Sequence, residues 1–253
     1  ADGNDATRPP VQQECSSDSR TDPNQPVQPG IAIVVPILNE GARLPKLLQM
    51  LEGAGADEIV IVDGGSTDGS DLLLSTRSYK WLKSKAGRAI QMNTGAKACR
   101  SDILLFLHAD TEITRASIDA VRRAMNASEI VGGRFDVQLS GEGSPFRLIA
   151  FMINLRSRLS RISTGDQCQF VRREIFEALN GFPEQPLMED VEFSKRLKRA
   201  GRIVCLRDKV TTSSRRWERH GVLKTILLMW KLRLLYWLGV APDRLSAMYR
   251  DAR

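Results

Sequence analysis

Short stretches that are apolar throughout alternate with amphipathic stretches in the first half of the chain. The stretches 31–36, 59–62 and 103–107 consist of aliphatic and aromatic residues with one proline, which predicts three buried strands. Helices are predicted between and after these strands, from apolar spacing and from N-capping residues, over 44–51, 68–74, 88–98 and 116–125. Uniformly apolar strands that alternate with amphipathic helices indicate an α/β fold with a mostly parallel central sheet flanked by helices.

Beyond residue 130 the pattern is looser. It predicts a strand over 135–139, at an edge or in an antiparallel pair, and a helix over 145–159. Two short strands are predicted over 169–171 and 203–206, with a helix over 191–200 between them. An apolar C-terminal stretch, 221–240, is interrupted by Lys224, Lys231 and Arg233. Because a cation is costly at the centre of a bilayer, this stretch is not expected to span a membrane.

The first 30 residues hold five of the eleven prolines and few apolar side chains. Such a stretch cannot bury enough surface to offset the entropy of ordering it, so residues 1–29 are expected to form a disordered tail. The expected organisation is therefore this tail, an α/β domain over 30–217, and a C-terminal helical segment over 218–253.

The composition excludes several classes of protein. Of the 253 residues, 42% are hydrophobic and 26% are charged, which is ordinary for a globular protein and excludes a collagen-like or wholly disordered chain. The four cysteines, Cys15, Cys99, Cys168 and Cys205, have no paired spacing, so neither a disulfide framework nor a cysteine metal site is expected. A reducing compartment, the cytoplasm, is the expected location.

The net charge of +7 is concentrated in two regions. Residues 72–101 contain seven basic residues and no acidic one, and residues 211–253 contain nine basic and three acidic residues. Such regions suit phosphate-bearing partners, which could be nucleotides, lipids or nucleic acid, or they form an ordinary solvated surface. No RNA-binding signature accompanies them, so nucleic acid is not an expected partner.

Polar residues follow each of the three predicted parallel strands, where ligands of such sheets bind. Asp110 comes after a purely apolar strand, and its carboxylate suits a divalent cation, although it could instead cap a helix. His108 faces the same way by strand alternation, as a ligand, a hydrogen-bond donor or a packed side chain. Asp63 ends the preceding strand, and the glycines after it, Gly64 and Gly65, let a ligand approach the backbone.

Two further positions carry candidate chemistry. Arg88 stands at the start of a predicted helix, where a side chain and backbone N–H groups together can hold a phosphate. Glu189 and Asp190 precede the helix predicted over 191–200. They are either acidic helix caps or, if an acceptor hydroxyl lies nearby, candidates for a general base.

In their order and spacing, these motifs resemble those of a family 2 glycosyltransferase. The motifs are VPILNE at 35–40, VDGGSTD at 62–68, Gly87-Arg88 with NTG at 93–95, FLHAD at 106–110 and MED at 188–190. The resemblance covers about residues 30–217 and is greatest to the small bacterial-type branch with FLHAD, GDQ and MEDVEF segments. It implies the nucleotide-sugar-binding fold called GT-A, with additional C-terminal helices.

The resemblance implies a role for each matching residue. Pro36, Glu40 and Asp63 would hold the base and ribose of a nucleotide sugar, and Arg88 would meet its diphosphate. Gly65, Asn93 and His108 would complete the nucleotide-sugar site. Asp110 would bind Mn²⁺ or Mg²⁺. Asp190 would be the general base, with Glu189 as the alternative. The acceptor side would consist of Gly165, Asp166, Gln167, Arg216 and Trp217.

Three positions depart from the family pattern. His108 stands where many relatives have the first Asp of the DxD motif, Gly64 replaces a second Asp in the nucleotide turn, and Ser213 replaces the Gln of QxxRW. The first change removes one carboxylate from the metal shell and leaves open whether His108 or His220 joins it. The last change argues against a processive polymerase and for single transfer.

The expected activity is metal-dependent transfer of a sugar from a nucleotide-diphosphate sugar to a hydroxyl acceptor, with inversion. The alternatives are a sugar-phosphate nucleotidyltransferase and a non-catalytic basic module that binds membranes. Trp230, Tyr236 and Trp237 lie among leucines and cations in the C-terminal stretch, as at a membrane interface. That stretch could therefore bring a peripheral enzyme to a lipid-linked acceptor, or it could pack on the domain or on a second copy.

Overall fold

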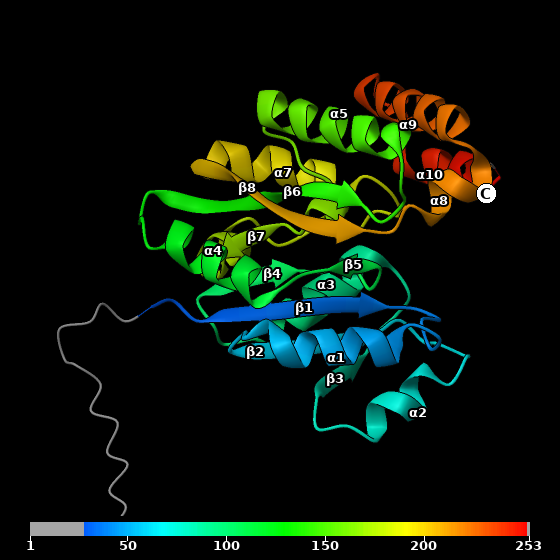
Figure 1. The fold of residues 1–253 in the computed structure, drawn as a ribbon. Coiled ribbons are helices and arrows are strands. Elements are labelled where there is room, and N and C mark those ends of the chain that lie inside the picture. Colours follow the sequence, from blue (N-terminus) through cyan, green and yellow to red (C-terminus); the bar gives the residue numbers. More distant parts are fainter. Residues whose placement is uncertain (1–27, 252–253) are drawn as a thin grey trace, which may run out of the picture.

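One eight-stranded sheet runs through the molecule and carries helices on both faces (Figure 1). The computed structural model describes residues 28–251, so all but the last two residues of the tail predicted over 1–29 lie outside the described part. The strand order is β3-β2-β1-β4-β7-β6-β8-β5. Four of the seven strand pairs are parallel and the remaining three are antiparallel, so the sheet is mixed. This confirms the α/β class with a central sheet flanked by helices.

The first half follows the predicted alternation of strands and helices. Its elements are β1 (Ile31–Ile37), α1 (Leu44–Ala54), β2 (Glu58–Asp63), α2 (Ser70–Ser75), β3 (Lys80–Lys83), α3 (Arg88–Lys97), β4 (Ile103–Phe106), β5 (Thr111–Glu112) and α4 (Arg115–Met125). The helix predicted from residue 68 begins at Ser70, because Gly69 takes the capping position in a left-handed conformation. Strand β3 was not predicted, since two of its four residues are exposed lysines.

Strands β1 and β4 are apolar throughout because both faces of the sheet are covered. Ile31, Ile33, Val35 and Ile37 of β1 pack into a core with α1 and α4. Ala32 and Val34 point the other way, into a core with α3 and α7. Burial on both faces removes the polar positions that would mark an exposed strand face, and so the sequence pattern locates these strands.

The second half contains β6 (Ile130–Leu139), α5 (Ser144–Ser160), the short 3₁₀ helix η1 (Gly165–Gln167), β7 (Phe170–Arg172), α6 (Arg173–Ala178), α7 (Glu189–Ala200) and β8 (Arg202–Thr212). Strand β6 pairs with β7 in the antiparallel sense at Gly132 and Gly133. For the predicted stretch 135–139, one of whose two alternatives was an antiparallel pair, the pairing is parallel, with β8. The other alternative, an edge strand, is wrong, because β8 pairs with the opposite side of β6.

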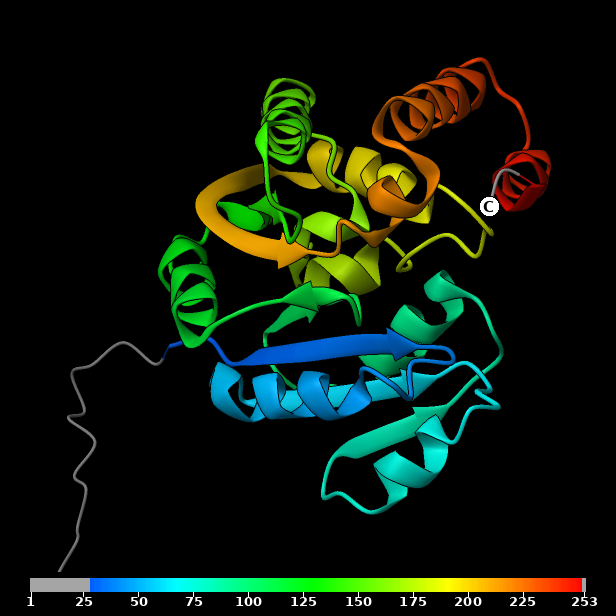
Figure 2. The same cartoon turned by 45° about the vertical axis from the view of Figure 1, so that its right-hand side comes forward.

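Three helices complete the chain: α8 (Arg215–His220), α9 (Val222–Trp237) and α10 (Pro242–Asp251). Leu232 of α9 and Leu245 of α10 are buried together with Met188 and Val191 at the start of α7. Figure 2 shows α9 and α10 as a pair beside the rest of the fold. Among the described helices, none combines the length and the apolar character that crossing a bilayer requires.

Candidate active site

The loops that follow β1 and β2 are joined by hydrogen bonds into one rim. The Asn39 Oδ1 atom accepts a bond from the Thr67 N–H at 2.8 Å, and the Asn39 N–H donates to Ser66 Oγ at 2.8 Å. The Gly41 N–H donates to Asp68 Oδ2 at 2.8 Å. Sequence reasoning did not assign these roles to Asn39 and Asp68. The signal available for them was the presence of polar residues in two loops that follow neighbouring parallel strands.

Asp63 ends β2 inside this rim and is buried. Its Oδ1 atom accepts bonds from the Ser66 N–H at 2.9 Å and the Ser66 hydroxyl at 2.6 Å. Its Oδ2 atom is buried and has no hydrogen-bond partner in the described part of the chain. A buried carboxylate oxygen without a donor is costly. The arrangement is therefore suited to a ligand that brings an N–H group to Asp63.

The glycine after Asp63 is required by a neighbouring glutamine. The buried Gln91 side chain, on α3, donates from Nε2 to the Ile37 carbonyl at 2.7 Å and to the Val62 carbonyl at 2.9 Å. A Cβ atom at Gly64 would lie only 3.0 Å from the amide of Gln91. The departure from the family pattern at Gly64 thus has a packing reason, since a side chain there would meet this amide.

Acidic side chains from two strand ends influence one another at the mouth of the sheet. Glu40, after β1, forms an ion pair with Arg43 at 2.9 Å. The pKa of Glu40 is raised, mainly by burial. The charges of Asp110 and Asp68 add to this rise, and Arg43 opposes it. Asp110 itself is exposed. Its carbonyl accepts a bond from the Ser213 N–H at 3.2 Å, which ties this loop to the end of β8.

The carboxylates of Glu40 and Asp110 are hard oxygen donors, the type that Mg²⁺ and Mn²⁺ prefer. Within the described residues, no three His, Cys, Asp or Glu side chains gather closely enough to form a metal site by themselves. Mg²⁺ is commonly held by one or two carboxylates together with substrate phosphates. The residues present therefore fit a cation that arrives with a diphosphate, and Asp110 is the most open ligand for it.

His108 connects the strand end to the segment predicted as the acceptor side. Its Nδ1 atom lies 3.6 Å from Asp166 Oδ1. The ring packs so closely on Gly165 that a Cβ atom there would lie 2.1 Å from His108 Cε1. Partial enclosure raises the pKa of Asp166, but the neighbouring His108, together with Arg88 and Arg216, lowers it to about 2. Asp166 therefore stays ionised beside the imidazole.

Glu189 and Asp190 begin α7 in different environments. Asp190 is half-buried, and its Oδ2 atom accepts a bond from the Gly165 N–H at 2.7 Å. Its Oδ1 atom accepts from the Val191 N–H at 2.7 Å. Glu189 is buried and pairs with Arg88 Nη1 at 3.2 Å. Burial and the charge of Asp190 raise the pKa of Glu189, while Arg88 lowers it.

Four other predicted site residues have contacts in the protein. Asn93 is engaged at both ends of its amide, which donates to the Phe182 carbonyl and accepts from the Phe182 N–H, each at 2.9 Å. Gln167 is fully buried and donates to Ser157 Oγ at 2.8 Å. Arg216 lies over the ring of Tyr249, 4.9 Å from its centroid. Pro36 lies within β1 and pairs in register with Val62.

Two predicted residues remain, Gly65 in the loop after β2 and Trp217 in α8. Gly65 has a positive φ of 92°, with nothing within 4 Å of the place of a Cβ atom. Trp217 is half-buried in α8. Sequence reasoning assigned no role in the site to Arg156, on α5, whose charge interacts with those of Asp190 and Asp166. The only signal in the sequence was the presence of arginines in the predicted helix 145–159.

Solved structures confirm the fold. The structure of S. aureus TarS residues 1–349 matches with a TM-score of 0.60 and 20% identity, over 78% of this chain and 64% of that one. The mannosyltransferase PcManGT from Pyrobaculum calidifontis, in complex with GDP-Man and Mn²⁺, matches with a TM-score of 0.64 and 18% identity, over 87% and 68%. These neighbours are GT-A glycosyltransferases.

Sequence comparisons show the family. An undecaprenyl-phosphate 4-deoxy-4-formamido-L-arabinose transferase of Pseudomonas aeruginosa (strain LESB58) is 30% identical over 165 residues, 59% of this chain and 49% of that protein. The corresponding transferase of Pseudomonas paraeruginosa is 28% identical over the same length. The chain thus spans about half the length of these curated relatives. The model of glycosyl transferase family 2 matches residues 32–179, more than half of the chain, and the chain therefore belongs to this family of glycosyltransferases.

Proposed function

We propose that the chain moves one sugar from a nucleotide-diphosphate sugar to an acceptor oxygen, with inversion at the anomeric carbon. The observation that carries the proposal is the contact between the two halves of the site at residues 108–110. His108 packs on Gly165, whose N–H donates to Asp190, and Asp110 follows directly on the strand-end side. A donor at the strand ends would therefore lie next to an acceptor at α7.

Asp63 is the proposed anchor of the nucleotide base. Its partnerless Oδ2 atom needs an N–H donor, and uracil and guanine each offer a ring N–H. Solved neighbours in complex with UDP-GlcNAc and with GDP-Man support a nucleotide sugar as the donor. Pro36, Glu40 and Gly65 complete the proposed base and ribose site, and Arg88 at the start of α3 meets the diphosphate.

A divalent cation, Mn²⁺ or Mg²⁺, is proposed to be held by Asp110 together with the donor's phosphates. When bound, it neutralises the charge that develops on the departing diphosphate. The complex of PcManGT with Mn²⁺ supports this assignment. His108 is turned toward Asp166, so we place it beside the acceptor and outside the metal shell.

Asp190 is proposed to be the general base. Each of its two oxygens accepts a hydrogen bond from a backbone N–H group at 2.7 Å, and these bonds fix the position of the carboxylate. It takes the proton of the acceptor hydroxyl as that oxygen attacks the anomeric carbon, and the nucleotide diphosphate leaves with the bonding electron pair. Glu189, which is buried, positions the more exposed Arg88 through their ion pair.

Nucleotide binding is tested by thermal unfolding of the full chain with UDP or GDP, with and without Mn²⁺. We expect at least one nucleotide to raise the midpoint of unfolding, and to raise it further with Mn²⁺, because a ligand of the folded state stabilises it by mass action. Asp63→Ala should remove the shift while the protein stays folded. No shift with any nucleotide diphosphate, with or without metal, would contradict the proposed function.

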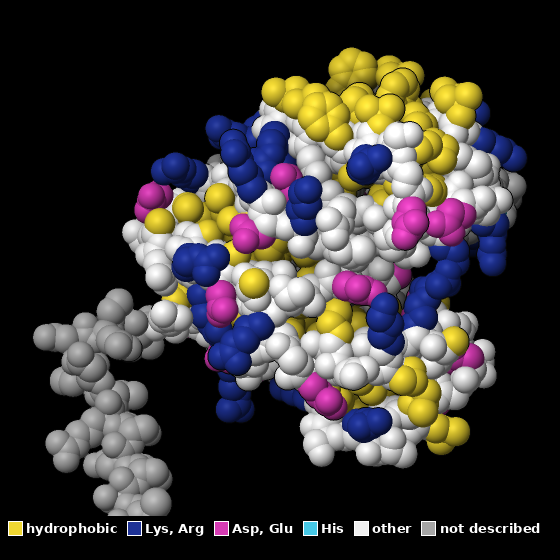
Figure 3. All heavy atoms as spheres, in the orientation of Figure 1, with side chains coloured by type: hydrophobic (Ala, Val, Ile, Leu, Met, Phe, Trp, Pro, Cys, Tyr) yellow, Lys and Arg dark blue, Asp and Glu magenta, His cyan; other side chains and the backbone are white. Residues whose placement is uncertain are grey.

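The location of the acceptor is proposed from two helices with exposed apolar faces. On α5 these residues are Leu148, Phe151, Met152, Leu155 and Leu159, and on α9 they are Leu223, Leu227, Trp230, Leu234, Trp237 and Leu238. Figure 3 shows them gathered along one side of the molecule, over α5 and α9. Neither helix contains an acidic residue, and three of their cations, Arg147, Lys224 and Lys231, are exposed. We call this surface the two-helix face.

This combination of apolar and basic side chains suits an anionic membrane surface, where each cation contributes about 1 kcal/mol. The names of the curated relatives, transferases that act on undecaprenyl phosphate, support a lipid-linked acceptor. We therefore propose a peripheral enzyme whose two-helix face lies on the membrane. Its cytoplasmic location and the division at residues 29 and 217 stay predictions.

Vesicle flotation checks the membrane proposal. The wild type should float with vesicles that contain anionic lipid and should be released by high salt, because screening weakens the attraction of surface charges. Phe151→Glu combined with Trp230→Glu should abolish flotation. Leu72→Glu, at an equally exposed leucine on α2, is the matched control and should float normally. Failure of the wild type to float, together with dimers in solution, would assign the face to a second copy.

A further inference from the structure

Arg156, on α5, has buried nitrogens that lack an acceptor in the described part of the chain. Its Nε and Nη2 atoms are buried and have no hydrogen-bond partner among the described residues. A guanidinium can donate five hydrogen bonds and stays charged in proteins, so leaving the three N–H groups of these two buried nitrogens without acceptors is costly. Such a group is stable only if another molecule accepts its hydrogen bonds in the working protein, or if the rest of the fold offsets the free-energy cost of the buried donors.

Arg233, on α9, adds a second positive charge at the same place. Burial lowers the pKa of Arg156 to about 10, and the charge of Arg233 contributes to that shift. Burial also lowers the pKa of Arg233. Within the described chain, no carboxylate forms an ion pair with either arginine. The nearby acids are engaged elsewhere, Asp166 with His108 and Asp190 with backbone N–H groups. Two partly buried cations therefore lie in the same region with no ion-paired carboxylate among the described residues.

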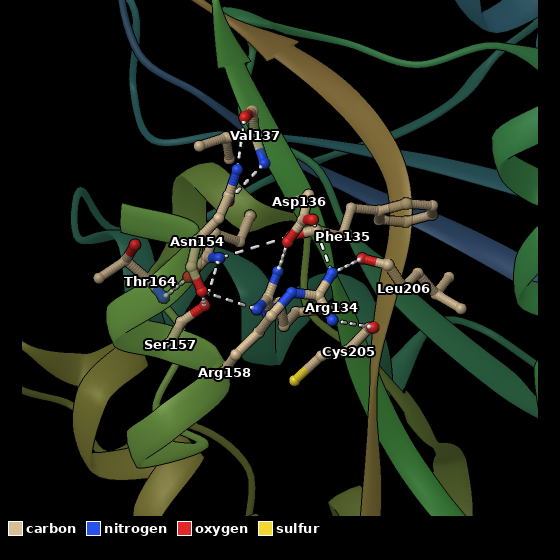
Figure 4. Close-up of polar contacts among 11 residues, drawn as sticks. Arg134, Phe135, Asp136, Val137, Asn154, Ser157, Arg158, Thr164, Cys205 and Leu206 are labelled. Carbon is tan, nitrogen blue, oxygen red and sulfur yellow. Dashed lines mark hydrogen bonds and ion pairs between the residues drawn. The ribbon is translucent and has the colours of Figure 1, made fainter. Parts of the chain in front are cut away.

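The helix that carries Arg156 is fixed in place by its neighbours (Figure 4). Asn154 exchanges two hydrogen bonds of 2.9 Å with the backbone of Val137. Arg158 pairs with Asp136 at 2.6 Å and donates to the carbonyls of Cys205 and Leu206. These contacts, on either side of Arg156 in the sequence, hold α5 against β6 and β8. Arg156 is therefore presented by a rigid element, as binding residues commonly are.

The surroundings of the pair indicate the chemistry of the ligand. An anion is required by the two guanidinium groups, and arginine recognises phosphate with paired, charge-assisted hydrogen bonds. The same two helices form the apolar two-helix face, which is suited to a hydrocarbon chain. Leu232, next to Arg233, is buried with Met188 and Val191, which flank Glu189 and Asp190. Ser157, next to Arg156, accepts a hydrogen bond from Gln167, which follows Asp166. These contacts place the two arginines beside the proposed acceptor site.

We propose that Arg156 and Arg233 bind the phosphate group of a lipid acceptor whose chain lies along the two-helix face. The proposal rests on the proposed glycosyl transfer, and it concerns recognition of the acceptor whichever of its oxygens receives the sugar. It assigns the substrate class as a lipid that carries a phosphate. It also gives the C-terminal helix α9 a direct part in the active site, besides its place at the membrane.

Calorimetry on the full chain tests the proposal with three probes: farnesyl phosphate, farnesol and inorganic phosphate. The wild type should bind farnesyl phosphate at least about tenfold more tightly than either of the others, because only this probe offers both the anion and the chain. Arg156→Gln and Arg233→Gln should each weaken farnesyl phosphate binding at least about tenfold, which is the range for loss of one charge-assisted contact. Lys97→Gln, at an exposed lysine of α3 outside the two-helix face, is the matched control and should bind within twofold of the wild type.

A stability readout separates this role from a structural one. Without ligand, Arg156→Gln should unfold at the same temperature as the wild type or higher, since the change removes an unsatisfied buried charge. A structural arginine would give the opposite result. If Arg156→Gln does not fold, Arg156→Lys keeps the charge without the planar fork and should still weaken farnesyl phosphate binding.

Two results would overturn the proposal. Equal affinity of the wild type and both glutamine variants for farnesyl phosphate would show that the arginines do not bind it. Inorganic phosphate binding as tightly as farnesyl phosphate would show that the site takes a free anion and no lipid. Binding of UDP or GDP with Mn²⁺ is measured on the same variants and should be unchanged. Failure of nucleotide binding in the wild type would contradict the proposed function. The farnesyl phosphate titrations would still decide the role of the two arginines.

Discussion

Replacing Asp190 with asparagine should lower the turnover number at least about 100-fold, the range for loss of a general base. The amide is nearly isosteric with the carboxylate but cannot accept the proton of the acceptor. The substitution leaves the site's backbone donors in place, and the affinity for nucleotide diphosphate should stay within about twofold of the wild type. Steady-state kinetics and calorimetry on the same preparation measure the two quantities, which separates loss of chemistry from loss of binding.

Glu189→Gln is the matched control for Asp190→Asn because it changes the neighbouring carboxylate. Glu189 is buried and pairs with Arg88, so its loss leaves a guanidinium without its partner. We expect this variant to bind nucleotide diphosphate more weakly and to be less stable, with the larger part of its defect in binding. Near-normal turnover in Asp190→Asn, beside an inactive Glu189→Gln that still binds donor, would reverse the two roles.

Replacing Asp110 with asparagine should weaken nucleotide diphosphate binding at least about tenfold when Mn²⁺ is present, because a charged ligand of the cation is lost. Without metal, the mutant and the wild type should bind alike. The exposed position of Asp110 means that the free energy of unfolding should hardly change. Calorimetric titration with UDP or GDP, with Mn²⁺ and then with chelator, gives all four affinities.

Glu112→Gln is the control for Asp110→Asn. Glu112 lies two residues further along, in β5, and its carboxylate pairs with Lys46 on the surface. This substitution removes the same charge from the same region without touching the proposed cation, so the metal-dependent affinity should not change. Equal weakening in both variants would mean that general electrostatics, and no specific ligand, accounts for the effect.

The strand ends of the site were predictable because the strands themselves are covered on both faces. Uniform burial of β1 and β4 leaves an apolar run with polar residues at its end, as at Asp110. Strand β8 shows the limit of this signal. Its middle residues Arg207, Asp208 and Lys209 are exposed, so only 203–206 had the pattern of a strand, although the pairing with β6 extends to Thr212. Pairing between distant segments was not visible in either one alone.

Polar residues inside the fold were the harder part of the site to predict. Asn93 and Gln167 match family motifs, yet both make hydrogen bonds within the protein that hold neighbouring segments in place. Arg156 and Arg233 match no motif, and they lie more than 70 residues apart in the sequence, on different helices. Only the packing of α5 and α9 on the rest of the fold brings their charges together. A sequence pattern locates a residue on an element, but it does not state which distant element that residue faces.

The clamp that Gln91 forms between the ends of β1 and β2 also restricts which mutations this nucleotide turn can accept. An aspartate at position 64, as the family pattern has it, would place its Cβ atom 3.0 Å from the amide of Gln91, which would have to shift while its two hydrogen bonds hold it in place. Loss of Gln91 alone would leave the carbonyls of Ile37 and Val62 without their donor. Each single change is therefore harmful where the pair of changes can be tolerated. Positions 64 and 91 should vary together during evolution, and a laboratory search for altered base specificity should randomise both at once.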